Sequence, residues 1–218
     1  MKTFKIAIQV LVVFVITSCT SISKLYNSGS VPQEEFSGRI AFETMFDLII
    51  LPVEIEGKQY RFLFDTGAPM VISKELREQL ELKAAAKSGV TDSQGKTERL
   101  DYVWLKEVKL AGIEFKKTGA IVADLRKAPE IACMDIDGIL GANLMKLAHW
   151  KIDSKNNAMY FASRKDQLEI PDSEPLVLPF KMKRTYTPVV DLVVDDSVEV
   201  NNATFDTGFA GYLSLGFG

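Results

Sequence analysis

Two copies of one acidic triplet are the residues of this chain best suited to chemistry. Asp65-Thr66-Gly67 follows the apolar-rich Arg61 to Phe64, and Asp206-Thr207-Gly208 follows Ala203-Thr204-Phe205. In each frame a serine stands eight positions after the aspartate, as Ser73 and Ser214. An aspartate at a strand end, followed by a glycine that permits a tight turn, presents its carboxylate at a loop tip. The repeat therefore predicts two equivalent loops, each carrying one carboxylate.

Two such loops brought face to face predict acid–base chemistry that uses no metal and no cofactor. Two carboxylates at contact distance resist double ionisation, so the pair holds one proton and titrates as a unit. The ionised member can take a proton from a water held between them, while the protonated member donates to a carbonyl under attack. The pattern predicts amide hydrolysis by an activated water, with Asp65 and Asp206 as the pair of carboxylates.

The composition disfavours several other classes of function. The chain has 26 Lys and Arg against 29 Asp and Glu, and this balance disfavours nucleic-acid binding, which needs clustered cations. It has a single histidine, His149, so His-rich zinc sites are disfavoured. We interpret His149 as a core or rim side chain because it lies in an apolar run. Cys133 is expected to be a buried apolar residue rather than a nucleophile, since no base is near it in sequence.

The first 19 residues have the pattern of an export signal. Lys2 and Lys5 precede an apolar run too short for a membrane span, which needs about 20 apolar residues. The run ends in Ile16-Thr17-Ser18-Cys19, which resembles the bacterial lipoprotein signal. The resemblance implies lipidation of Cys19 and anchoring to a membrane of the cell envelope, facing the periplasm or exterior. An ordinary signal peptide with an incidental cysteine is the alternative. Residues 20–38 are Ser-rich and are expected to be a tether.

A second resemblance concerns the triplets themselves. Leu63 to Ala68 resembles the active-site motif of retropepsin-like and pepsin-like aspartic proteases, and Asp137 to Leu144 resembles the element that packs behind the catalytic loop in that family. Val90 to Glu98 is the best candidate for the family's flap. The resemblance implies a mainly β, acid-protease fold with a closed β-barrel lobe. It makes Asp65 and Asp206 the catalytic residues and assigns loop support to Thr66, Gly67, Thr207, Gly208, Ile139, Leu140 and Gly141.

Several elements must position these residues. Residues 100–110 and 115–123 are expected to be strands joined by a turn at Gly112, and residues 150–153 and 159–161 are expected to close the lobe. Ser73 is expected to cap a helix over residues 74–80. The first lobe then spans residues 39–163, and residues 164–175 form a linker.

Residues 176–218 are expected to form only part of a second lobe. Gly141 lies 76 positions after Asp65, and the same spacing from Asp206 reaches beyond Gly218. We therefore expect a fragment or a truncated gene product that is poorly active and prone to aggregate, because a half-built sheet leaves unpaired backbone and an exposed apolar face.

Three functions fit these observations. The first is an endopeptidase of the cell envelope that binds extended peptides or unfolded proteins in the cleft between its lobes. The second is a homodimer of first lobes that supplies Asp65 twice. The third is a non-catalytic, peptide-binding envelope lipoprotein that keeps a protease-like fold, because a fold does not guarantee its usual activity.

Overall fold

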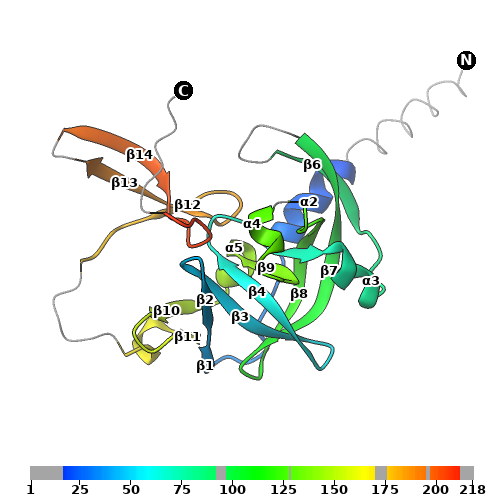
Figure 1. The fold of residues 1–218 in the computed structure, drawn as a ribbon, viewed down its shortest axis with the longest axis horizontal. Helices are drawn as coiled ribbons and strands as arrows, with labels where there is room; N and C mark the ends of the chain where they lie inside the picture. Colours follow the sequence, from blue (N-terminus) through cyan, green and yellow to red (C-terminus); the bar gives the residue numbers. More distant parts are fainter. Residues whose placement is uncertain (1–16, 92–96, 128, 170–175, 195–196, 212–218) are drawn as a thin grey trace, which may run out of the picture.

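The structure is a computed structural model that describes residues 17–91, 97–127, 129–169, 176–194 and 197–211 (Figure 1). Strands predominate, so the expected mainly β class is confirmed. Residues 30–162 form a first unit, and residues 181–211 form a smaller second unit.

The first unit is built on one eight-stranded sheet that closes on itself. Its tight turns at Glu56-Gly57 and Ala111-Gly112 have positive φ at all four residues, the backbone geometry that lets one strand fold directly onto the next. Pairing of Glu54 with Lys109 joins β3 to β7 and completes the ring. The strands, in sheet order, are β2 (Glu43–Met45), β3 (Leu48–Ile55), β4 (Lys58–Asp65), β9 (Gly138–Gly141), β5 (Val71–Ser73), β8 (Ile113–Ala123), β7 (Thr97–Leu110) and β6 (Ala86–Thr91).

A three-stranded sheet closes the other end of the first unit. Its strands, in sheet order, are β1 (Ser37–Ala41), β11 (Ala158–Ala162) and β10 (His149–Asp153). Phe161 is fully buried, and its ring stacks on Trp150 at 5.2 Å between centroids. The two expected closing strands are therefore confirmed, and aromatic packing attaches them to the main core.

Short helices connect the strands. The N-cap of α3 (Lys74–Gln79) is Ser73, as predicted: its Oγ accepts from the Leu76 backbone N–H at 3.0 Å. The other helices are α2 (Thr17–Asn27), α4 (Pro129–Ala132), α5 (Ala142–Met145) and the 3-10 turn η1 (Lys165–Gln167). Among the described residues, no helix has the length and apolar content of a membrane span.

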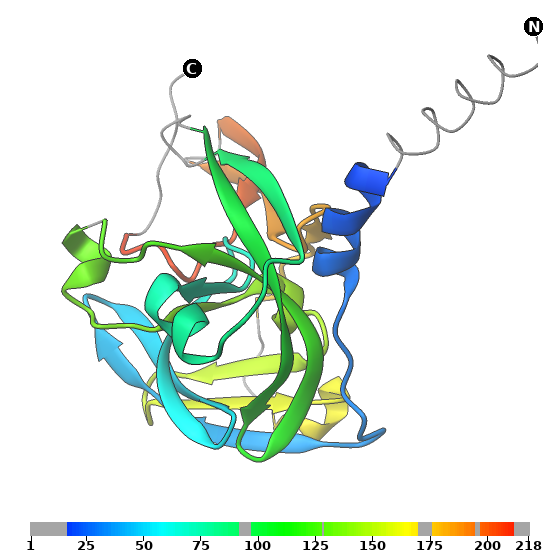
Figure 2. The ribbon, with the colours of Figure 1, turned by 90° about the vertical axis from the view of Figure 1, so that its right-hand side faces the viewer.

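The segment expected to be a tether packs on the first unit instead. Helix α2 lies beside β6, β7 and β8 (Figure 2), and Leu25 is only 1% exposed. Ser30 pairs through its backbone with Lys116 of β8. The apolar side chains of Ile22, Leu25 and Tyr26 give the helix a face that joins a buried cluster, which a Ser-rich reading of residues 20–38 overlooked.

The second unit is a single sheet of β12 (Lys181–Met182), β13 (Pro188–Val194) and β14 (Val198–Thr204). In Figure 1 its orange strands project away from the first unit. It carries several exposed apolar side chains, including Phe180, Met182, Val193 and Val198. Exposed apolar side chains are thus present in the described part of residues 176–218, but Val193 and Val198 lie on opposite faces of the sheet and do not form one apolar face.

Two side chains lie differently from their sequence interpretation. Cys133 is exposed, because the four-residue helix α4 before it lies at the surface rather than in the core. His149 is also exposed, at the first position of β10, so the core part of its interpretation as a core or rim side chain is wrong.

Candidate active site

The two Asp-Thr-Gly loops meet at the junction of the two units. The first loop follows β4, and the second follows β14, drawn in cyan and red in Figure 1. Asp65 is half-buried at the end of its strand, whereas Asp206 is exposed. The structure therefore brings together the two triplets that the sequence repeat predicted to face each other.

Reciprocal hydrogen bonds between threonines join the loops. The Thr66 backbone N–H donates to Thr207 Oγ1 at 3.1 Å, and the Thr207 N–H donates to Thr66 Oγ1 at 3.0 Å. Each hydroxyl then donates across to the opposite strand, Thr66 to the Phe205 carbonyl at 2.6 Å and Thr207 to the Phe64 carbonyl at 3.0 Å. Four hydrogen bonds thus fix the two loops in a near-symmetric arrangement.

The glycines allow the opposite carboxyl group to approach. A Cβ placed on Gly67 would lie 2.5 Å from Asp206 Cγ, and a Cβ on Gly208 would lie 2.3 Å from Asp65 Cγ. Real Cβ atoms essentially never stand this close to another heavy atom. Each loop therefore needs glycine at its third position because the aspartate of the other loop occupies the space of a side chain.

Backbone donors orient the carboxyl groups. Asp65 Oδ1 accepts from the N–H groups of Gly67 at 2.7 Å and Ala68 at 3.0 Å, and Asp206 Oδ1 accepts from the N–H of Gly208 at 2.8 Å. In both aspartates the same oxygen is held by its own loop, so the second oxygen, Oδ2, remains for other partners.

The surroundings of Asp65 change its protonation. Burial, the negative charge of Asp206 and a hydrogen bond with Asp206 raise the pKa of Asp65 to about 7, while the donors at Gly67 and Ala68 act in the opposite direction. A carboxyl group with this pKa stays protonated at mildly acid pH. The site can therefore hold one proton next to a second carboxyl group, which is the arrangement that acid–base hydrolysis requires.

Strand β9 supports the first loop from behind. Its residues Ile139, Leu140 and Gly141 are buried and pair with Leu63, Phe64 and Asp65 in parallel register. A Cβ on Gly141 would lie 2.0 Å from the Pro69 carbonyl carbon, so the loop packs directly on this glycine. The Ala142 N–H also donates to the Ala68 carbonyl at 2.8 Å. The three residues lie where the resemblance expected them.

Sequence reasoning missed one residue of this support. Asn143 is fully buried, accepts from the Met70 N–H at 2.6 Å and donates to the Gly119 carbonyl at 2.9 Å. It thereby ties the end of the Asp65 loop to β8. An amide inside the buried stretch Gly138 to Leu144 was the available signal, because a buried polar side chain needs partners.

The flap candidate is partly described. Strands β6 and β7 form a hairpin whose last pair is Thr91 with Thr97, so Val90 and Glu98 lie on its two strands. The tip at Asp92-Ser93-Gln94 lies outside the described residues, as do Ser214 and the expected signal at residues 1–16. The side chain of Cys19, the expected lipidation site, also lies outside them.

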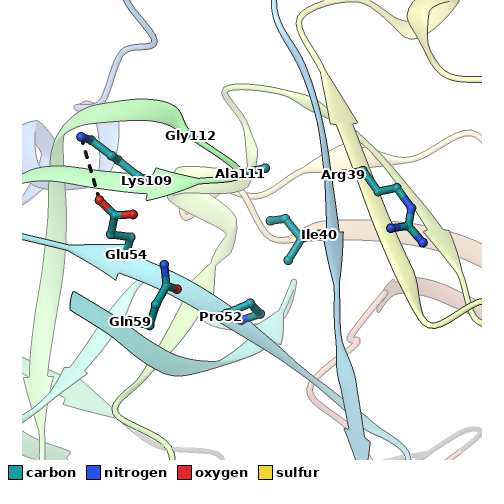
Figure 3. A pocket seen from close by; sticks show the side chains of 8 residues that line it. All are labelled: Arg39, Ile40, Pro52, Glu54, Gln59, Lys109, Ala111 and Gly112. Atoms are coloured by element: carbon teal, nitrogen blue, oxygen red, sulfur yellow. Dashed lines mark ion pairs between the residues drawn. The ribbon is translucent and has the colours of Figure 1, made fainter. Parts of the chain in front are cut away.

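A surface hollow of about 310 Å³ lies away from the aspartate pair. Figure 3 shows its lining side chains from β1, β3, β4 and β7. Lys109, one of its two cationic side chains, is already paired with Glu54 at 4.0 Å and Glu107 at 3.3 Å. The hollow contains none of the predicted site residues. Within the described part of the chain, no cluster of three His, Cys, Asp or Glu side chains could hold a metal ion.

One segment of the chain matches a known protein family. Residues 51–144 match the family model of aspartyl proteases. Among solved structures, the chain is similar to a retropepsin-like aspartic protease from Rickettsia conorii, with 20% identity, a TM-score of 0.41, and coverage of 59% of this chain and 92% of that chain. No curated protein sequence matches. The matched segment contains the first Asp-Thr-Gly triplet and Ile139-Leu140-Gly141, so the resemblance to the family is confirmed there.

Proposed function

We propose that this chain, which carries the aspartyl protease family pattern over residues 51–144, is an aspartic endopeptidase. One observation carries the proposal. The carboxyl group of each aspartate lies against the glycine of the opposite loop, and this brings the carboxyl groups of Asp65 and Asp206 close together. In this reading Asp65 and Asp206 are the catalytic residues, and the two Thr-Gly pairs keep them in place.

The chemistry follows from one shared proton. A water between the carboxyls gives a proton to the ionised aspartate, and its oxygen forms a bond to the carbonyl carbon of the substrate. The protonated aspartate gives its proton to the carbonyl oxygen. The resulting diol collapses: the C–N bond breaks, the leaving nitrogen takes the proton that came from the water, and one diol hydroxyl returns a proton to the aspartate that had protonated the carbonyl oxygen, which leaves a carboxylic acid and the original pair. The raised pKa of Asp65 favours it as the initial donor, although the pair titrates together.

The proposed substrate is an extended peptide or an unfolded protein. The β6–β7 hairpin extends beyond the ring of strands, and a peptide next to it can pair through its backbone as an added strand. This mode of recognition depends on an extended conformation, which folded proteins do not present. Selectivity for unfolded chains is therefore expected.

We also propose that the protein works at the cell envelope, attached by a lipid on Cys19. Support comes from the export pattern of residues 1–19. Because Leu25 is buried only six residues after Cys19, a lipid there would hold the first unit close to the membrane surface. Incorporation of a labelled fatty acid, and its loss in Cys19→Ser, tests this part of the proposal. Unlabelled wild-type protein would refute it.

The enzymatic proposal is tested with Asp65→Asn. Cleavage of a denatured protein between pH 3 and pH 7 should fall by about 1,000-fold or more, because one member of an acid–base pair is lost. Asp47→Asn is the matched control, since Asp47 is exposed at a turn with φ of 62°, a conformation that asparagine also adopts. Equal activity of wild type and Asp65→Asn would refute the assignment. Failure of wild type to cleave any unfolded substrate between pH 3 and pH 7, or to bind a transition-state mimic of the peptide bond, would favour the non-catalytic alternative.

A further inference from the structure

A turn ahead of β13 makes a second contact between the two units. The turn is closed by the Lys183 N–H, which donates to the Thr187 carbonyl at 2.9 Å, and it presents Tyr186 toward the first unit. Thr187 is buried, and its hydroxyl donates to the Gly67 carbonyl at 3.4 Å. The turn therefore lies against the back of the Asp65 loop.

The turn is rigidly connected to Asp206. Pro188, the first residue of β13, accepts through its carbonyl from the Phe205 N–H at 3.0 Å, and Val189 pairs with Thr204. Asp206 directly follows Phe205. A shift of Tyr186 would consequently move the Asp206 loop as well, because one pair of hydrogen-bonded strands connects them.

Lys146 is the residue that Tyr186 meets on the first unit. Its Nζ lies 4.0 Å from the centre of the Tyr186 ring and donates to the Tyr26 carbonyl at 2.8 Å. Lys146 ends α5, which follows Gly141, the residue in register with Asp65. A cation over an aromatic ring is attracted by the ring face, most strongly where water is excluded. Burial lowers the pKa of Lys146, which is consistent with such a site.

Helix α2 completes the contact. The Tyr26 carbonyl lies in the last turn of α2, where unpaired carbonyls favour a cation. The Tyr186 hydroxyl donates to Asn27 Oδ1 at the end of the same helix. Tyr186 itself has φ of 67°, a conformation that costs a non-glycine residue energy and persists only where the surroundings hold it.

We infer that Lys146 is a positioning residue, which clamps Tyr186 against the end of α2 and thereby sets the Asp206 loop opposite the Asp65 loop. The threonine hydrogen bonds join the loops at one place, and a second contact removes the freedom to rotate about it. The inference gives the N-terminal helix a part in the site, and its effect on catalysis rests on the proposed function.

The test compares Lys146→Met with Lys151→Met. Lys151 also lies over a tyrosine ring, at 4.9 Å from the centre of Tyr160, but within the small sheet of the first unit. The first readout is the titration of the Asp65 carboxyl carbon by NMR in the full chain. In Lys146→Met the pKa of Asp65 should move toward the ordinary value of about 3.9, because the charge and hydrogen bond of Asp206 withdraw. Lys151→Met should titrate like wild type.

The second readout is cleavage of the denatured substrate. Lys146→Met should lower kcat by about fivefold with a nearly unchanged KM, the factor expected for loss of one partly buried cation–π contact. The basic limb of its pH profile should move to lower pH. Lys146→Arg, which keeps a cation over the ring, should restore both kcat and the position of the basic limb.

Two outcomes would overturn the inference. One is an Asp65 titration in Lys146→Met that matches wild type. The other is a decrease of kcat in Lys146→Met that Lys146→Arg does not restore. If Lys146→Met fails to fold, Tyr186→Leu replaces it, because that change removes the ring and leaves the bond from Lys146 to Tyr26. The NMR titration reads loop geometry whether or not the protein cleaves peptides. Absence of cleavage by wild type would thus refute the proposed function without deciding the role of Lys146.

Discussion

Gly67 of the first loop lies directly against the carboxyl group of Asp206 from the second, and a Cβ on Gly67 would stand 2.5 Å from Asp206 Cγ. The same relationship holds in reverse between Gly208 and Asp65. The third position of each triplet therefore does more than permit a turn in its own loop. It leaves the space into which the opposite carboxyl group fits. Each loop of the repeat therefore depends on the glycine of the other.

Replacing Gly67 with alanine should separate the carboxyls. The added methyl group meets both oxygens of Asp206, at 2.5 and 2.7 Å, and the Asp206 loop must retreat to admit it. We expect at least about a hundredfold loss of cleavage, since small displacements in a site can cost this much. The first unit should keep its thermal unfolding midpoint, measured by circular dichroism. Full activity in Gly67→Ala would show that the loops do not need this close approach.

Removing the hydroxyl of Thr66 should loosen the two units. Thr66→Val loses the bond to the Phe205 carbonyl and leaves the Thr207 N–H without its acceptor, at a cost of about 2 kcal/mol for two hydrogen bonds. Thr66→Ser keeps the hydroxyl and serves as the control. Urea unfolding followed by fluorescence should give a lower midpoint for valine than for serine. Identical midpoints would contradict the structural role of this bond.

The pKa of Asp65 predicts how stability depends on pH. The folded state holds the pKa near 7, above the value of about 3.9 in an unfolded chain, so the folded protein binds the extra proton between these limits. The stabilisation from this group is fully present below about pH 4 and is lost as pH rises toward 7. Urea unfolding at pH 4.5 and pH 7 should show this loss in wild type and a smaller one in Asp65→Asn. Parallel curves for the two proteins would contradict the raised pKa.

Asn143 should prove costly to replace despite lying outside the repeat. Asn143→Leu leaves the Met70 N–H and the Gly119 carbonyl buried without partners, which costs about 2–4 kcal/mol. Asn143→Asp keeps an acceptor for Met70 but loses the donor to Gly119, so it should fall between wild type and leucine. Chemical denaturation of the three proteins measures this order. A leucine variant as stable as wild type would mean that the Asp65 loop does not depend on this amide.

The meeting of the two loops was predictable from the sequence because the signal is local and repeated. Two Asp-Thr-Gly triplets with matching frames predicted two loops that meet, and the structure places them in contact. The strands over residues 100–110 and 115–123 were predictable from alternation and from the Gly112 turn. The N-cap at Ser73 followed from side-chain chemistry alone.

The rest depended on tertiary contacts. Helix α2 was overlooked because its three apolar residues stand among serines. Only their packing beside β8 shows that they form a buried face. Lys146 and Tyr186 are 40 positions apart, and no local pattern links a lysine to a distant tyrosine. Cys133 was expected in the core because its neighbours are apolar, yet a short helix carries it to the surface. The places of these residues in the fold are set by the side chains they pack against, and a single sequence does not identify those side chains.

Asp65 and Asp206 of one chain are proposed to act as a catalytic pair. The most direct measurement is cleavage of a denatured protein between pH 3 and pH 7 by wild type and Asp206→Asn, each at two protein concentrations tenfold apart. The pairing of Asp65 with Asp206 predicts that wild type cleaves with the same specific activity at both concentrations and that Asp206→Asn is inactive at both. Cleavage by Asp206→Asn that increases in specific activity with concentration would contradict it, because two first units would then supply Asp65 twice.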